Sequence, residues 1–155
     1  MLPNVFTPLV VISILARGIS AQVPSSLALG CWVVSFAAWE PPVATGDGGL
    51  YPLPDTIHLT ARKAERTYFE ATRRPNRVPD ILRENLDSLR AFWKPTTTDS
   101  IELWLPSWWS TGIRATLQLR SDTLRGVAAI YVDVIGRPVP KSRMTATRVS
   151  CGRGA

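Results

Sequence analysis

The chain contains two cysteines, Cys31 and Cys151, and a single histidine, His58. These residue types commonly act as nucleophiles, bases or metal ligands. Nucleophilic catalysis by serine or cysteine needs a nearby base, and Thr60 and Arg62, the expected outward neighbours of His58, do not complete a triad with it. No cysteine or carboxylate stands at metal-binding spacing from His58 in the sequence. We therefore expect a surface histidine, no metal site and no cofactor.

The sequence lacks the motifs that mark common enzyme classes. It has no Gly-rich phosphate loop, no Gly-x-Ser-x-Gly elbow and no His-Glu-x-x-His zinc motif. Asp99 and Glu102 form a carboxylate pair that can in principle do acid and base chemistry, but roles at a turn and on a strand surface are far commoner for such residues. We predict a protein that is not an enzyme, with an enzyme of an unrecognised type as the remaining alternative.

The N-terminal segment has the layout of a secretory signal peptide. An apolar stretch at 9–16 is followed by a short segment with small and turn-forming residues, and cleavage is expected after Ile19-Ser20-Ala21. This stretch is shorter than the roughly 20 apolar residues that a membrane span needs. We predict a signal peptide at 1–21 and a single secreted or periplasmic domain at 22–155. An uncleaved anchor and a lipoprotein attached through Cys31 are the alternatives.

Cys31 and Cys151 stand near opposite ends of this domain, with no cysteine between them. In an oxidising compartment, two cysteines pair most simply as one disulfide. On the chain-entropy model, closing so long a loop stabilises the fold by roughly 4 to 5 kcal/mol. Two free buried thiols are the alternative.

The chain carries a formal net charge of +6 at pH 7. Two groups of cationic side chains fall close together in the sequence, at 62–77 and at 137–143. In most proteins such groups lie in solvent-exposed turns. They can also face anionic lipid, phosphate or an acidic protein. Because no recognition helix or interleaved aromatic motif accompanies them, we expect no nucleic-acid partner.

Short apolar runs separated by turn-forming residues indicate an all-β domain. Several runs alternate apolar and polar side chains, as in 113–120, which is the period of a half-buried strand. The segment 37–54 is rich in proline and glycine and is predicted to be a long surface loop outside the sheet. Residues 79–89 are predicted to form one short helix. About eight strands are expected, and they begin at Cys31, Thr56, Thr67, Arg90, Ser100, Gly112, Thr123 and Met144.

A disulfide between the first and last strands makes these strands neighbours. If Cys31 lies opposite Cys151 in an antiparallel pair, Arg148 falls diagonal to Trp32 and can lay its guanidinium on the indole. Pairing of the first and last strands leaves no free edge, so we predict a closed antiparallel up-and-down barrel. The face that carries Trp32 and Arg148 is the apolar one, and it also holds Val34, Phe36, Met144 and Ala146.

Gly30-Cys31-Trp32 at the start of the first strand, with Arg148 near the end of the last, resembles the Gly-x-Trp and arginine pair of lipocalin and wider calycin barrels. The resemblance implies that the arginine packs over the tryptophan and plugs one end. A family of small exported bacterial proteins without an assigned function is the alternative. Because a barrel of this size can enclose one small ligand, we predict binding of a small apolar or amphipathic molecule. The predicted ligand-binding residues are Trp32, Phe36, Leu117, Ile130 and Met144.

Three tryptophans, Trp104, Trp108 and Trp109, surround one predicted turn. Strand alternation points Trp104 outward, and Pro106 interrupts the ladder. Trp108 and Trp109 either cover the core or belong to a binding surface. The second functional hypothesis is therefore a non-catalytic interaction module, which docks on an envelope or membrane protein complex through these three tryptophans and the basic loops.

Overall fold

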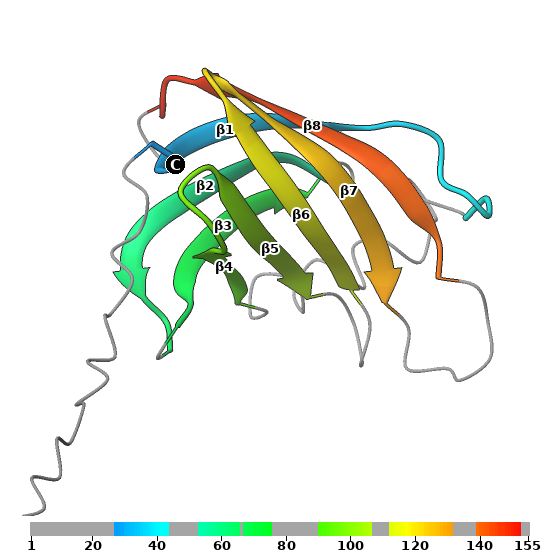
Figure 1. Ribbon diagram of the computed structural model, residues 1–155, viewed down its shortest axis with the longest axis horizontal. Helices are drawn as coiled ribbons and strands as arrows, with labels where there is room; N and C mark the ends of the chain where they lie inside the picture. The colour runs from blue at the N-terminus through cyan, green and yellow to red at the C-terminus, as the bar shows by residue number, and fades with distance from the viewer. Residues whose placement is uncertain are drawn as a thin grey trace, which may run out of the picture.

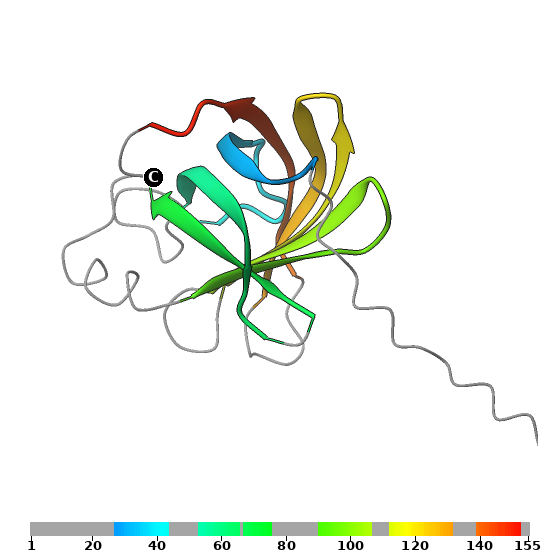
Figure 2. The same ribbon diagram turned by 90° about the vertical axis from the view of Figure 1, so that its left-hand side faces the viewer.

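The computed structural model describes residues 27–43, 53–65, 67–75, 90–106, 112–131 and 139–152. In these ranges the chain forms eight strands that make one closed antiparallel barrel in sequence order, from β1 to β8 (Figures 1 and 2). The predicted all-β barrel is confirmed, and the helix predicted at 79–89 lies outside the described residues. The strands are β1 (Gly30–Phe36), β2 (Pro54–Lys63), β3 (Phe69–Pro75), β4 (Ala91–Pro95), β5 (Ser100–Pro106), β6 (Gly112–Arg120), β7 (Thr123–Tyr131) and β8 (Lys141–Val149).

Alternation of side chains along each strand builds the core. In β6, the side chains of Ile113, Ala115 and Leu117 are buried, whereas those of Arg114 and Thr116 between them are exposed. Inward side chains from all eight strands form one apolar cluster inside the barrel. In the described part of the chain, no helix has the length and apolar character needed to cross a membrane.

The β1–β8 ladder closes the barrel, and the Cys31–Cys151 disulfide is present beside it. The register is not the expected one: Cys31 lies opposite Val149 instead of Cys151, and Trp32 lies directly opposite Arg148. Cys151 follows the end of β8 and is not a ladder residue, so its sulfur reaches Cys31 from the chain beyond the last pair. The shift is of two residues, which leaves every side chain on its predicted face.

The segment after β1 corrects the predicted loop at 37–54. Glu40 forms a bridge with Lys141, and the amide of Ala37 donates to the carbonyl of Arg143, so this part of the chain continues along β8. Pro54 already belongs to β2. Burial of the Trp39 indole, which stacks on Phe36 at a ring-centroid distance of 5.7 Å, accounts for this docking.

The two ends of the barrel differ in how their strands are connected (Figure 1). The turn end holds the start of β1, the end of β8 and the short connections 64–68, 96–99 and 121–122. At the loop end, three connections are longer, 37–53, 76–90 and 132–140, and the fourth, 107–111, is as long as 64–68. All four lie partly or wholly outside the described residues.

Candidate functional site

Arg148 seals the turn end of the barrel. Its guanidinium carbon lies 4.3 Å from the centroid of the Trp32 ring, and its Nε donates to Asp122 at 3.1 Å. Nη1 donates to the carbonyl of Leu29 at 2.6 Å, and Nη2 donates to the carbonyl of Leu27. The Trp32 indole N–H donates to the carbonyl of Ala28 at 3.1 Å. The segment before β1 is therefore fastened across this end.

Gly30 belongs to the same seal. Its φ is +123°, a conformation that other residues rarely adopt, and a Cβ at this position would lie 3.0 Å from Nη1 of Arg148. The glycine therefore lets the chain turn under the guanidinium. The packing of Arg148 over Trp32 agrees with what the calycin resemblance implied.

The five residues predicted to line the lumen all lie on the inner side of the strands or at its rim. Trp32, Leu117, Ile130 and Met144 are fully buried, and Phe36 is half-buried at the loop end. Trp32 and Leu117 lie toward the turn end, whereas Phe36, Ile130 and Met144 lie toward the loop end. Trp93 also fills the turn end, where its indole N–H donates to the carbonyl of Thr60 at 2.9 Å. The role of the five predicted residues as ligand contacts stays a prediction.

Arg73 is a cationic residue on the inner face of the barrel near the loop end. The sequence pattern did not identify it as inward-facing. Arg73 lies opposite the buried Ile57 in the β2–β3 ladder, and its Nε and Nη2 atoms are inaccessible to solvent. Burial raises the pKa of Tyr131, and the charge of Arg73 lowers it in part. β3 and β7 both end at the loop end, so Arg73 and Tyr131 lie at the same end of the barrel as Phe36 and Ile130. This end therefore combines aromatic, apolar and cationic side chains.

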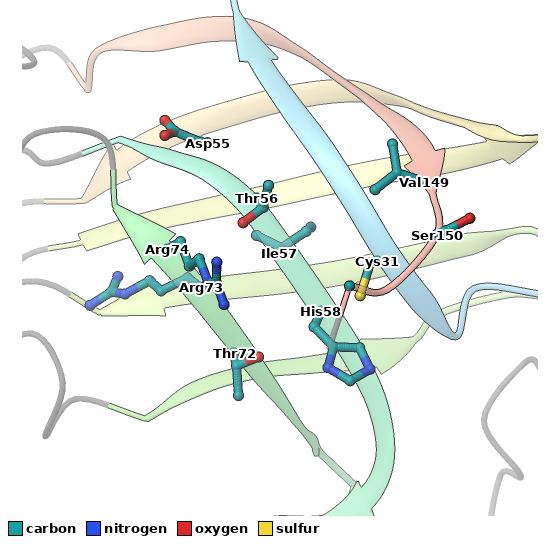
Figure 3. A pocket seen from close by; sticks show the side chains of 11 residues that line it. Cys31, Asp55, Thr56, Ile57, His58, Thr72, Arg73, Arg74, Val149 and Ser150 are labelled. Carbon is teal, nitrogen blue, oxygen red and sulfur yellow. The ribbon is translucent and has the colours of Figure 1, made fainter. Parts of the chain in front are cut away.

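A groove with a volume of about 510 Å³ lies outside the lumen, along β1, β2, β3 and the chain after β8 (Figure 3). Cys31 and His58 are directly opposite each other in the β1–β2 ladder. The two sulfurs of the Cys31–Cys151 disulfide and the His58 imidazole offer ligand atoms that all lie within 4.8 Å of one another. Thr56, Thr72 and Ser150 also line this groove.

The expectation for His58 is corrected by this arrangement. His58 lies on the outer face as predicted, but it is half-buried beside two sulfur atoms instead of free in solvent. Spacing along the chain could not reveal this, because Cys31 becomes its neighbour only through strand pairing.

Aromatic side chains form a row on the outer wall of the barrel, which we call the outer aromatic row: Tyr68, Phe92, Trp104 and Tyr131. Trp104 faces outward as predicted, and its ring centroid lies 5.5 Å from that of Tyr131. The rings of Tyr68 and Phe92 are 6.3 Å apart, and Phe92 pairs with Trp104 in the β4–β5 ladder. A small cavity of about 180 Å³ lies among Glu65, Tyr68, Phe92 and Trp104. Trp108 and Trp109 lie outside the described residues.

Glu102 anchors the centre of this outer wall. Its carboxylate accepts a hydrogen bond of 2.7 Å from the Trp104 indole and forms ion pairs with Arg114 at 2.5 Å and Lys94 at 3.2 Å. Burial alone raises the pKa of Glu102, but the hydrogen bonds from Trp104, Arg114 and Lys94 outweigh it, so the pKa lies below its usual value. Hydrogen bonds to Glu102 and Tyr68 raise the pKa of Lys94. The negative charge of Glu102 and the positive charge of Lys94 therefore stabilise each other.

No protein-family model matches the sequence, and no curated protein matches it significantly. The closed eight-stranded barrel is consistent with a calycin-like architecture.

Proposed function

We propose that this protein is an exported, calycin-like barrel without catalytic activity, which binds a small apolar or amphipathic molecule at its loop end. The observation that carries the proposal is the difference between the two ends. The turn end is closed by Arg148, Trp32 and Trp93. At the loop end, by contrast, Phe36 is half-buried, and Arg73 lies on the inner face of β3.

Burial within the lumen favours the loop end over the centre of the barrel. Trp32, Leu117, Ile130 and Met144 have almost no accessible surface, so a ligand reaches them only if side chains move. Phe36, at the loop end, is the one residue of the five that is half-buried. An apolar ligand placed against Phe36 gains about 25 cal/mol for each Å² of apolar surface that leaves water.

The disulfide supports the proposed location. A bond between Cys31 and Cys151 persists in oxidising compartments, and the apolar segment at 9–16 has the layout of an export signal. We infer a secreted or periplasmic protein that is processed near Ala21.

Titration with the uncharged fluorescent probe N-phenyl-1-naphthylamine tests the proposed binding. We expect saturable binding to the full chain, and Phe36→Ser should weaken it roughly tenfold through loss of about 1.5 kcal/mol of apolar contact. Val33→Ser is the matched control on the same strand, because Val33 is 47% exposed on the outer face. Absence of saturable binding, or equal weakening by both variants, would contradict the proposal.

Native mass spectrometry provides a test that needs no variant. The protein purified from its own host should retain a small mass that is lost on denaturation. If only the bare polypeptide is found and the probe does not bind, the lumen has no ligand role.

The outer aromatic row favours a second candidate function, an interaction module for an envelope or membrane-associated protein. Aromatic side chains interspersed with arginine are enriched at protein interfaces. Trp104→Ser should then remove a co-purifying partner, whereas Val127→Ser, a change at another outward position that is 49% exposed, should retain it. Retention of the partner by both variants, and by Trp108→Ser and Trp109→Ser, would exclude this role for the tryptophans.

A further inference from the structure

The groove beside the disulfide brings together three residues with the chemistry of a soft metal site. Two sulfurs and one imidazole nitrogen are the donor set of Cys₂His zinc centres that keep one position open. Here the donors come from Cys31, Cys151 and His58, whose candidate ligand atoms all lie within 4.8 Å of one another. While the sulfurs are bonded to each other, they are not thiolate ligands.

We propose that reduction of the Cys31–Cys151 disulfide converts this cluster into a binding site for a thiophilic divalent cation of the Zn²⁺ class. A dithiol reductant supplies two electrons and two protons, which break the sulfur–sulfur bond and give two thiols, while the reductant becomes a disulfide. The cation then displaces both thiol protons and binds two thiolates and the imidazole of His58. This site is independent of the ligand proposed for the loop end.

The strands hold two of the three donors in place without the disulfide. Cys31 and His58 are directly opposite each other in the β1–β2 ladder, and β1 is also paired with β8 from Cys31 to Phe36. Backbone hydrogen bonds therefore keep these two side chains adjacent after reduction. Cys151 is exposed and lies beyond the end of β8, so its sulfur has room to move away from that of Cys31.

The dimensions of the cluster agree with tetrahedral zinc. Zinc–sulfur bonds of about 2.3 Å in a tetrahedron place two sulfurs roughly 3.8 Å apart, and a sulfur and a nitrogen slightly closer. The two sulfurs are bonded to each other in the disulfide, so the thiolates must move apart when the cation binds, and the exposed position of Cys151 allows this. The fourth position faces a groove with hydroxyl groups of Thr56, Thr72 and Ser150 along its walls, where a water molecule can complete the coordination.

Cobalt titration of the full chain tests this inference. After reduction with a phosphine, one Co²⁺ per chain should bind and give the thiolate charge-transfer and tetrahedral d–d absorption bands, and Zn²⁺ should displace it. The oxidised protein should give neither band. His58→Ala should weaken Co²⁺ binding at least tenfold, whereas Thr72→Val, a change in the same groove at a residue that is not a ligand, should leave it unchanged.

Thiol protection provides a second measurement that uses only the wild-type chain. Zn²⁺ should slow alkylation of both cysteines in the reduced protein and should slow their reoxidation by oxidised glutathione. Absence of the cobalt bands in the reduced wild-type protein, equal bands in His58→Ala, or unchanged alkylation in the presence of Zn²⁺ would each overturn the proposal. None of these outcomes depends on whether the loop end binds a ligand.

Discussion

Glu102 shows how the barrel wall changes the environment of a single side chain. The sequence suggested a carboxylate on a strand surface, yet only 6% of Glu102 is exposed. Lys94 comes from β4 and Arg114 from β6, so the ion pairs tie three consecutive strands together. A buried carboxylate with three donors stabilises a fold only while all of them remain in place.

Glu102→Gln should lower the free energy of unfolding at pH 7 by about 1 to 3 kcal/mol, because the variant loses the charge-assisted bonds to Lys94 and Arg114. Because the pKa of Glu102 is lowered in the folded state, the stabilisation that its ionised carboxylate provides is complete above the pKa of glutamate in the unfolded chain. It is lost as the pH falls through the lower pKa of the folded state. Urea unfolding at pH 7 and near pH 3 measures both effects, and the difference between wild type and variant should shrink in acid.

Glu70→Gln is the matched control. Glu70 pairs with Arg62, whose side chain is 79% exposed, so this substitution should cost less than about 1 kcal/mol. Equal losses for the two variants would show that burial of Glu102 has no energetic consequence.

Gly126 shows the opposite case, in which a side chain is excluded. A Cβ at this position would overlap the backbone oxygen of Thr116 and lie 2.9 Å from its carbonyl carbon. Gly126→Ala must therefore separate β6 from β7 and should destabilise the fold by about 1 to 3 kcal/mol or more. Gly152→Ala, with no atom within 4 Å of the new methyl group, should leave the thermal midpoint unchanged.

At the scale of elements, the alternation of side chains made the strands predictable. All eight strands begin within three residues of the predicted positions, and β5, β6 and β7 begin at the predicted residues. The period of two also predicted which face of β6 is buried. The apolar pattern therefore predicted the strands, and the expected disulfide between the first and last strands predicted their closure into a barrel.

Register was not predictable from the same pattern. A shift of two residues between β1 and β8 preserves both faces, so the sequence pattern is equally compatible with Cys31 opposite Cys151 or opposite Val149. The neighbours of His58 and Glu102 depend on register, which is why their surroundings were missed. Trp39 was missed for another reason, because Pro41 and Pro42 indicated a loop while burial of the indole docks the chain onto β8.

The disulfide and the β1–β8 ladder contribute separately to closure. The double variant Cys31→Ser, Cys151→Ser removes a link across 120 residues and should lower the free energy of unfolding by up to about 4 to 5 kcal/mol. The ladder remains, so amide hydrogen exchange should still show protected β1 amides in the folded variant. Free exchange along β1 would show that the covalent bond alone keeps the barrel closed.

At the scale of the whole molecule, closure of one end and binding at the other are separable. Arg148→Ala removes the contact with Trp32 and the hydrogen bonds to Leu27, Leu29 and Asp122. It should lower the free energy of unfolding by about 2 to 3 kcal/mol. Naphthylamine affinity of the folded variant should stay within about twofold of wild type, a change of less than roughly 0.5 kcal/mol. A tenfold loss of affinity would instead place the ligand near Trp32.

Adjacent strands in sequence are adjacent in the barrel, and β1 and β8 complete the ring, with 5.2 Å between the Cα atoms of Cys31 and Cys151. We therefore expect the barrel to tolerate a change in which strand comes first in the chain. A circular permutant that links Gly152 to Leu27 through a short glycine-rich tether, and opens the chain between Thr97 and Thr98, keeps all eight ladders. We expect it to fold into the same barrel, which would give a reporter domain or a tag access to the turn end.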